Sequence, residues 1–428
     1  MSLDRPVLIN AVSARAGGGV NDLLHTLPRL RDALGKRGWN INVFCAAEAI
    51  DELLANGYPP REMRRINTRS PLRRGLWEFV RLPQLVRSLR PAVVFHFSNF
   101  IFRDLPVPQV VVLRSLTYFA PEYAAMRRKG YQNLRYRLGR YYSSLTIERA
   151  AAVFCISQTH RRQIIQSVGT MGERVRVAPL GVQIPESARR LIGAQRRELL
   201  ELLPTEHRQP LQPLVQAGRR VVLNVSHYYT QKNFLTLLRA MELLARRRSD
   251  VTLVITAGIE QYRGGRNEQV EQEIRLARTL RQRGVLCDLG PVSKQCVWPL
   301  LAMADVFTFP SSLESFGHPL LEAMGMDVPV VAADTEIHRE ICGQAAMMHP
   351  VFDPEALAEA IERATDDGAL RTRLIAAGRL NIRRFSWDTH VEQLVQAILE
   401  VAGQPSTDSI AGDEQCAAPA APAVVQER

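Results

Sequence analysis

Residues 305–334, DVFTFPSSLESFGHPLLEAMGMDVPVVAAD, alternate between strand-like and helix-like segments, and this alternation decides the fold. The apolar run 305–309 predicts a buried strand. A helix then opens near Gly317 and Pro319, because proline is favoured in the first turn of a helix. Residues 328–334 predict a second strand. A strand, a helix and another strand in this order predict a parallel sheet with right-handed crossovers.

The same alternation continues on both sides of this stretch. Segments with helical leucine spacing, such as 20–36, lie between the apolar runs. In the first half the predicted strands are 7–14, 40–46, 91–97, 107–115, 151–157 and 174–182. In the second half they are 221–226, 251–257, 284–290, 305–309 and 328–334. Both halves are therefore predicted to be doubly wound α/β units.

The length of 428 residues suits two domains rather than one. We predict a Rossmann-like N-terminal domain at 1–185, a polar, proline-containing connector at 186–219 and a Rossmann-like C-terminal domain at 220–384. A helix at 385–402 and an unstructured, Ala- and Pro-rich tail at 403–428 follow. The predicted fold class is thus α/β, with two doubly wound domains facing each other across a cleft. Ligands of such sheets bind at the C-terminal ends of the strands.

Composition narrows the class of protein. Hydrophobic residues make up 46% and charged residues 23% of the chain, which is typical of a globular protein. No apolar run approaches the roughly 18–20 residues of a membrane span, and the start lacks the pattern of a signal peptide. The six cysteines are scattered and form no CxxC pair, so neither a disulfide framework nor a zinc site is expected. We therefore expect a cytoplasmic location.

Charge is distributed unevenly between the two halves. Residues 1–185 contain 28 Lys and Arg against 12 Asp and Glu, a net charge of +16, whereas the remainder carries −4. The segments 61–74 and 127–142 are rich in arginine, and the second interleaves arginine with aromatic residues. One interpretation is peripheral attachment to anionic lipid at the inner face of the membrane. Solvated arginine-rich faces are the alternative. Nucleic-acid binding is a rival that lacks a zinc-finger or RNP motif.

Two glutamates flank the predicted start of the helix in the opening stretch. Glu314 lies in the loop, and Glu322, eight residues later, is expected on the first helical turn. Free N–H groups at Ser315, Phe316 and Gly317 are placed to hold phosphate oxygens. Carboxylates beside a phosphate are useful where they accept hydrogen bonds from hydroxyls, which points to sugar and ribose. The alternative is an ordinary acidic helix start.

Two other strand ends carry groups suited to phosphate. His227 and Lys232 follow the strand at 221–226, and a lysine ahead of a helix start is well placed for a phosphate. In ARAGGGVNDLL, Gly18 and Gly19 allow a ligand to approach the backbone closely. A solvated loop lysine and a plain tight turn are the alternatives. The GxGxxG fingerprint of dinucleotide-binding proteins is absent from this glycine-rich turn.

Taken together, these segments resemble glycosyltransferase family 4, whose members have the two-domain GT-B fold and retain the anomeric configuration. The similarity covers roughly residues 8–402. The two glutamates of ESFGHPLLEAMGMDVPVV match the family's double-glutamate motif closely. The segment around Lys232 matches a weaker family signature, as do VRVAPLGV at 175–182, FCISQTHRR at 154–162 and FSWDTH at 385–390.

The resemblance implies roles for individual residues. Lys232 would bind the donor diphosphate, Glu314 the hydroxyls of the donor sugar and Glu322 the ribose hydroxyls. Backbone groups of both halves would lie near the donor, at Gly18, Gly19, Ser315, Phe316 and Gly317. The last helix would cross back to the N-terminal domain.

The sequence departs from the family pattern at two positions. Members usually have an arginine near the position of His227, where it assists Lys232. Many members also have a histidine at the end of the strand that here ends in Arg114, and His96 is the nearest histidine expected in the cleft. We therefore assign His96 and Arg114 to the catalytic site together with Glu314 and Lys232. A satisfied core histidine is the alternative for His96.

The resulting prediction is a retaining, hexosyltransferase-type glycosyltransferase. It would move a sugar from a nucleotide-diphosphate-sugar donor to a hydroxyl of a glycan or lipid-linked acceptor, in polysaccharide or lipopolysaccharide synthesis. The chain contains no Asp-x-Asp motif, so neither a metal nor a cofactor is expected. Nucleic acid is not an expected partner, and the oligomeric state is left open. A phosphorylase, a nucleotide-sugar epimerase and a non-catalytic sugar-binding protein are the alternatives.

Overall fold

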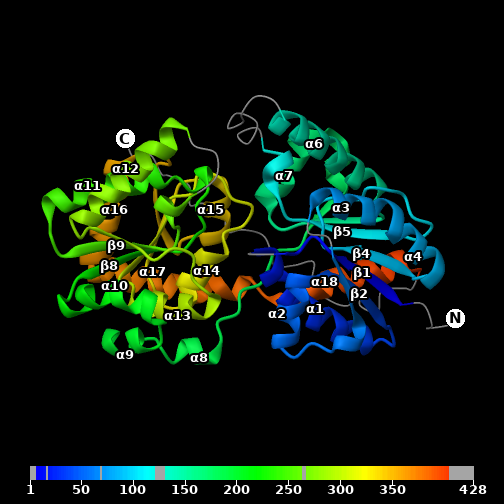
Figure 1. Ribbon diagram of the computed structural model, residues 1–428, viewed down its shortest axis with the longest axis horizontal. Helices are drawn as coiled ribbons and strands as arrows, with labels where there is room; N and C mark the ends of the chain where they lie inside the picture. The colour runs from blue at the N-terminus through cyan, green and yellow to red at the C-terminus, as the bar shows by residue number, and fades with distance from the viewer. Residues whose placement is uncertain (1–5, 16–17, 68–69, 121–130, 263–266, 404–428) are drawn as a thin grey trace, which may run out of the picture.

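The computed structural model describes residues 6–15, 18–67, 70–120, 131–262 and 267–403. Two α/β domains, each built on a parallel sheet, lie side by side (Figure 1). This architecture confirms the predicted fold class. The predicted tail lies outside the described residues from position 404 onward, as do parts of the arginine-rich segments.

A seven-stranded sheet forms the core of the N-terminal domain, in the order β3-β2-β1-β4-β5-β6-β7. Its central strands are buried along their whole length, which explains why the sequence shows continuous apolar runs there. The strands β1 to β7 span Val7–Ala11, Ile41–Ala46, Met63–Ile66, Val93–His96, Gln109–Leu113, Ala152–Cys155 and Val175–Val177. The helices α1, α2, α3, α4, α6 and α7 span Gly18–Gly35, Ala47–Ala55, Pro71–Leu76, Leu82–Leu89, Tyr131–Arg149 and Gln158–Val168.

A six-stranded sheet forms the core of the C-terminal domain, in the order β10-β9-β8-β11-β12-β13. The strands β8 to β13 span Arg220–Asn224, Val251–Ile255, Leu286–Asp288, Val306–Phe309, Val330–Ala333 and Ala346–His349. The helices α11 to α17 span Phe234–Arg247, Glu268–Gln282, Lys294–Met303, His318–Gly325, Glu336–Cys342, Pro354–Asp366 and Gly368–Asn381. The predicted connector contains three short helices, α8 (Glu186–Arg189), α9 (Arg196–Glu201) and α10 (Thr205–Gln216).

Each sheet has one point where the strand order reverses. In the first sheet it lies between β1 and β4, and in the second between β8 and β11. Loops that leave adjacent strands at such a point diverge to opposite faces and open a crevice at the carboxyl ends of the strands. The site should therefore lie at these two strand pairs.

The last helix, α18 (Trp387–Val401), returns to the N-terminal domain and packs against α1, as the predicted fold requires. Two ion pairs hold α18 here: Arg29 of α1 pairs with Asp388 at 2.9 Å, and Arg37, in the turn after α1, pairs with Glu392 at 2.8 Å. The chain thus crosses between the domains twice.

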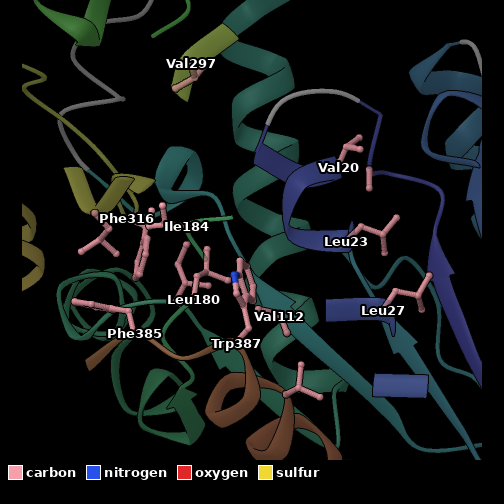
Figure 2. Packing of buried hydrophobic residues seen from close by; sticks show 14 of the residues in the cluster. Val20, Leu23, Leu27, Val112, Leu180, Ile184, Val297, Phe316, Phe385 and Trp387 are labelled. Carbon is pink, nitrogen blue, oxygen red and sulfur yellow. The ribbon is translucent and has the colours of Figure 1, made fainter. Parts of the chain in front are cut away.

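The two crossings meet at one small junction. The Val182 N–H donates to the Phe385 carbonyl at 3.1 Å. Figure 2 shows Leu180 and Ile184 of the first crossing close to Phe385 and Trp387 of the second. This apolar junction ties the domains together at the base of the cleft.

The sequence prediction misses two edge strands, β3 and β13. The β3 strand lies inside the arginine-rich segment 61–74, where the exposed Arg64 and Arg65 interrupt any apolar run. The β13 strand is only partly buried. Edge strands are short and partly exposed, so they lack the continuous hydrophobic signal of central strands.

Two buried histidines of the N-terminal domain predict acid sensitivity. Burial lowers the pKa of His96 to about 4 and that of His160 to about 3. Between the ordinary value near 6.5 and these values, the unfolded chain binds more protons than the folded chain. Each ring therefore lowers the free energy of unfolding by up to about 1.4 kcal/mol per pH unit as the pH falls. Urea unfolding between about pH 7.5 and about pH 5 should show this loss.

His160→Leu should reduce the pH dependence, because leucine has a similar size and does not titrate. Both ring nitrogens of His160 lack a hydrogen-bond partner in the described part of the chain, so the substitution breaks no hydrogen bond there. Equal pH slopes for the variant and the wild type would contradict this account of acid sensitivity.

The five cysteines within the described residues are buried, unpaired thiols, and burial raises the pKa of Cys45 and Cys155 to about 12. Such thiols behave as small hydrophobic side chains.

Among the described helices, none combines the length and the apolar character needed to cross a membrane.

Candidate active site

A cleft of about 920 Å³ lies between the domains, at the carboxyl ends of both sheets. Its walls come mainly from the loops after β1, β4 and β5 on one side and after β8, β9, β10 and β11 on the other. The cleft brings together every predicted site residue except His96, namely Gly18, Gly19, Arg114, His227, Lys232, Glu314, Ser315, Phe316, Gly317 and Glu322.

Lys232 and Glu314 form an ion pair in this cleft. The lysine Nζ lies 2.5 Å from the Glu314 Oε1, and both side chains are largely buried. The same Nζ lies 5.1 Å from the centroid of the Phe309 ring, at the end of β11. A cation held in this way by a carboxylate and an aromatic face has little freedom to move, so its charge is fixed at one point in the cleft.

The loops that carry this pair are bonded to each other. The Ser312 N–H donates to the Gln231 carbonyl at 2.8 Å. The Asn233 side-chain nitrogen donates to the Pro310 carbonyl at 3.2 Å and to the Val351 carbonyl at 2.6 Å. Asn233 adopts a left-handed φ of 55°, a conformation that asparagine tolerates. The loops after β8 and β11 therefore form one unit.

Glu322 lies on the second turn of α14 rather than on the first, because the helix begins at His318. The predicted position is thus wrong by one turn, but the side chain still lines the cleft. It is buried and forms an ion pair with Lys294, whose Nζ also lies 4.8 Å from the Trp298 ring centroid. Both glutamates of the motif are therefore paired with a lysine.

The N-terminus of α14 lines the same cleft as these two ion pairs. Gly317 precedes it with a φ of 104°, a region that favours glycine, and a Cβ there would lie 2.9 Å from the Leu320 Cδ1. The adjoining His318 donates from Nε2 to the Gly181 carbonyl across the junction, at 3.0 Å. The positive end of the helix dipole and its free N–H groups suit an anion at this point.

The N-terminal wall of the cleft carries Gly18, Gly19 and Arg114. A Cβ at Gly18 would meet nothing within 4 Å, so the backbone there borders open space. The Arg114 guanidinium lies 3.5 Å from Asp22 and 4.5 Å from the centroid of the Phe97 ring. Burial lowers the pKa of Arg114, and the Asp22 carboxylate opposes that effect. Arg114 thus lines the cleft as predicted, held by a partner that the sequence analysis did not name.

His96 does not line the cleft, and this placement contradicts the prediction. It is buried within the sheet, where Nδ1 lies 3.2 Å from the Asn10 side-chain nitrogen and Nε2 lies 3.1 Å from the Gln109 side-chain oxygen. Both ring nitrogens are satisfied by these neighbours. The alternative of a core histidine fits this placement. His96 is the last residue of β4, but its ring is bonded to side chains of the neighbouring strands β1 and β5 and does not extend into the cleft.

His227 lies on the exposed rim of the cleft. The sequence analysis missed Lys294 and Asp22, which both line the cleft. Lys294 carries a signal that could have found it, since it is a lysine at a helix start after a strand, as Lys232 is. Among the described residues, no cluster of three or more His, Cys, Asp or Glu side chains is suited to a metal ion.

Each half of the chain matches a glycosyltransferase family. Residues 207–381 match Glycosyl transferases group 1, and residues 19–184 match Glycosyltransferase Family 4. The chain belongs to glycosyltransferase family 4. It is therefore a glycosyltransferase of the hexosyltransferase type, as the sequence analysis predicted.

Curated relatives and a solved structure agree with this assignment. O-antigen chain mannosyltransferase B of Escherichia coli is 26% identical over 308 residues, which cover 71% of this chain and 73% of that protein. Phosphatidyl-myo-inositol mannosyltransferase of Mycobacterium tuberculosis is 30% identical over 203 residues, and the match covers 45% of this chain and about half (50%) of that relative. Anabaena Alr3699/HepE, solved with UDP and glucose, has a TM-score of 0.66 at 20% identity, over 92% of this chain and 99% of the other. The likeness shows the GT-B fold.

Proposed function

We propose that this family 4 enzyme is a retaining glycosyltransferase that uses a nucleotide-diphosphate-sugar donor and a glycan or lipid-linked hydroxyl acceptor. The observation that carries the proposal is the convergence of Lys232, Glu314 and Glu322 around the N-terminus of α14. A cation and a helix N-terminus suit a diphosphate, whereas two carboxylates suit the hydroxyls of a sugar and a ribose. The O-antigen and phosphatidyl-myo-inositol mannosyltransferases among the relatives support an acceptor in cell-surface polysaccharide or glycolipid synthesis.

The proposed reaction breaks the bond between the anomeric carbon and the donor phosphate oxygen. Negative charge then develops on the leaving diphosphate, where Lys232 and the amides of Phe316 and Gly317 stabilise it. The acceptor hydroxyl oxygen attacks the anomeric carbon from the face that the phosphate leaves, and its proton passes to a departing phosphate oxygen. Attack from this face retains the anomeric configuration. Closure of the domains excludes water, which would otherwise compete as the acceptor.

Nucleotide recognition tests the proposal most cheaply. A thermal-shift screen against UDP-, GDP- and dTDP-sugars should raise the melting temperature with one nucleotide class. A ligand at about 100 times its Kd stabilises the folded state by about 2.7 kcal/mol. The anomeric configuration of the product, measured by NMR coupling constants, should match that of the donor. Failure of every nucleotide sugar to bind would contradict the donor, and an inverted product would contradict retention.

Metal independence is an expected property of the transfer reaction. Lys232 and the helix N-terminus supply positive charge for the leaving diphosphate, and the chain contains no Asp-x-Asp motif. We therefore expect EDTA to change the initial rate by less than about twofold. Strict dependence on added manganese would contradict this expectation, and adding back magnesium after EDTA serves as the control.

Exposed apolar side chains support attachment of the N-terminal domain to a membrane surface. On α6, Leu134, Leu138 and Tyr141 recur at helical spacing and are about half exposed, next to the exposed Arg137 and Arg140. A second stripe, on α3 and the π-helical segment Trp77–Arg81, exposes Leu76, Phe79 and Val80. Apolar stripes beside arginine suit an anionic lipid surface, where a lipid-linked acceptor would lie.

Vesicle flotation tests this attachment. The wild type should float with vesicles that contain phosphatidylglycerol, and this binding should fall as salt is raised. The double substitution Leu134→Asp and Leu138→Asp should reduce the floated fraction by about fivefold or more. Leu202→Asp provides the control, because Leu202 is equally exposed but lies in the connector. Equal flotation with anionic and zwitterionic vesicles would contradict the attachment.

A further inference from the structure

A set of hydrogen bonds joins the two domains at the rim of the cleft. Helix α15 of the C-terminal domain lies against the N-terminus of α7 in the N-terminal domain (Figure 1). The Glu340 carboxylate of α15 accepts from the backbone N–H groups of Gln158 and Thr159, each at 2.7 Å. It also accepts from the Thr159 hydroxyl at 2.7 Å. One carboxylate therefore receives three hydrogen bonds from the opposite domain.

These contacts satisfy a helix end that one domain leaves incomplete. The first turn of a helix has N–H groups without an intrahelical partner, and a carboxylate there also interacts favourably with the helix dipole. In α7, Ser157 caps only the His160 N–H, at 3.1 Å. Glu340 supplies the acceptor for the two preceding N–H groups, those of Gln158 and Thr159. Separation of the domains would therefore expose the start of α7 as well as the carboxylate.

The same helix start contacts the loop assigned to the donor. The fully buried Ser157 donates its hydroxyl to the Ser315 carbonyl at 3.2 Å. In a planar trans peptide, the carbonyl of one residue and the N–H of the next point in opposite directions. A hydrogen bond to the Ser315 carbonyl from the N-terminal domain therefore orients the Phe316 N–H, and it polarises that peptide as a donor.

We propose that Glu340 and Ser157 are positioning residues that couple closure of the two domains to the geometry of the donor loop. The inference rests on the proposed function, because the Phe316 amide is assigned there to the leaving diphosphate. The Glu340 cap holds α7 against the C-terminal domain, and Ser157 then fixes the Ser315–Phe316 peptide. The fully assembled donor loop thus exists only when the acceptor-side domain has closed.

A neighbouring ion pair provides a matched control. Arg162 and Glu336 also join α7 to α15, at 3.5 Å, but both side chains are more than half exposed. Exposed pairs of this kind contribute little to an equilibrium between two states. Glu336→Gln therefore removes a charge from the same helix and the same interface without removing the cap.

The test compares Glu340→Gln, Ser157→Ala and Glu336→Gln in the full-length protein. Glutamine at position 340 keeps the size of the side chain but cannot accept from both backbone amides and the hydroxyl. Two measurements are made, kcat with the donor found by thermal shift and the radius of gyration by small-angle X-ray scattering with nucleoside diphosphate added. Circular dichroism checks that each variant folds.

We expect Glu340→Gln to lower kcat by about tenfold or more and to increase the radius of gyration, because charge-assisted hydrogen bonds are lost from the closed form only. Ser157→Ala should lower kcat as well, whereas Glu336→Gln should match the wild type within about twofold. A Glu340→Gln variant equal to Glu336→Gln in both measurements would overturn the proposal, as would a larger radius with unchanged kcat. If the wild type transfers sugar from no donor, the proposed function fails. In that case an unchanged radius of gyration in Glu340→Gln would separately overturn the role of Glu340 in domain closure.

Discussion

Lys232→Ala is expected to lower kcat/KM by about 10²- to 10³-fold, the range seen when one group that stabilises a developing oxyanion is removed. The lysine Nζ lies 2.5 Å from Glu314, and both side chains are largely buried in the cleft. Its removal takes away the cation for the leaving diphosphate and leaves a buried carboxylate without its partner, which repels the donor. Initial rates at several donor concentrations separate kcat from KM.

Two other lysines control for this result. Lys36 is exposed, so Lys36→Ala should leave kcat/KM unchanged. Lys294→Ala removes a second lysine of the cleft, one that pairs with the glutamate assigned to the ribose, and should act mainly on the KM for the donor. Retention of more than about a tenth of wild-type kcat/KM in Lys232→Ala would contradict the role assigned to Lys232.

Gly181→Ala is expected to lower the free energy of unfolding by about 3 kcal/mol or more, because it inserts an atom where the two chain crossings touch. A Cβ at this position would lie 2.2 Å from the backbone nitrogen of Trp387 and 2.5 Å from the Cγ of the same residue. The obstructing atoms include backbone, so no flexible side chain can move aside. Trp387 also stacks with His25 and with His318, at centroid distances of 4.9 and 5.8 Å. The strain therefore reaches both domains.

Gly368→Ala is the matched control for this substitution. Gly368 begins α17, and a Cβ there meets nothing within 4 Å. Alanine at that helical position should stabilise slightly, by up to about 1 kcal/mol. Thermal unfolding of both variants by differential scanning fluorimetry should separate them clearly. Equal melting temperatures would contradict the close packing of the junction.

Much of the fold was accessible from the sequence, because central strands of parallel sheets are buried on both faces and appear as apolar runs. The runs at 7–14 and 221–226, for example, became β1 and β8. The edge strands β3 and β13 were not predicted. Two arginines of β3 are exposed and most side chains of β13 are only partly buried, so neither strand shows a continuous apolar run. A local sequence pattern therefore indicates a strand that is buried on both faces of the sheet more reliably than a strand at its edge.

The candidate site was predicted less evenly. Lys232, Glu314 and Glu322 lie in the cleft because strand ends and helix starts place them there, which spacing can indicate. His96 was misplaced, because nothing in the sequence reveals that Asn10 and Gln109 occupy both of its ring nitrogens. Contacts across the domain interface are equally invisible, since they join residues far apart in the chain. The roles of the site residues remain predictions that the variants above test.

A crystal structure with a bound nucleoside diphosphate, chosen by the thermal-shift screen, tests the central claim most directly. We predict phosphate oxygens within hydrogen-bond distance, about 2.7–3.2 Å, of the Lys232 Nζ and the amides of Phe316 and Gly317. The ribose should contact Glu322. A diphosphate bound elsewhere in the cleft, with Lys232 turned away from it, would contradict the account.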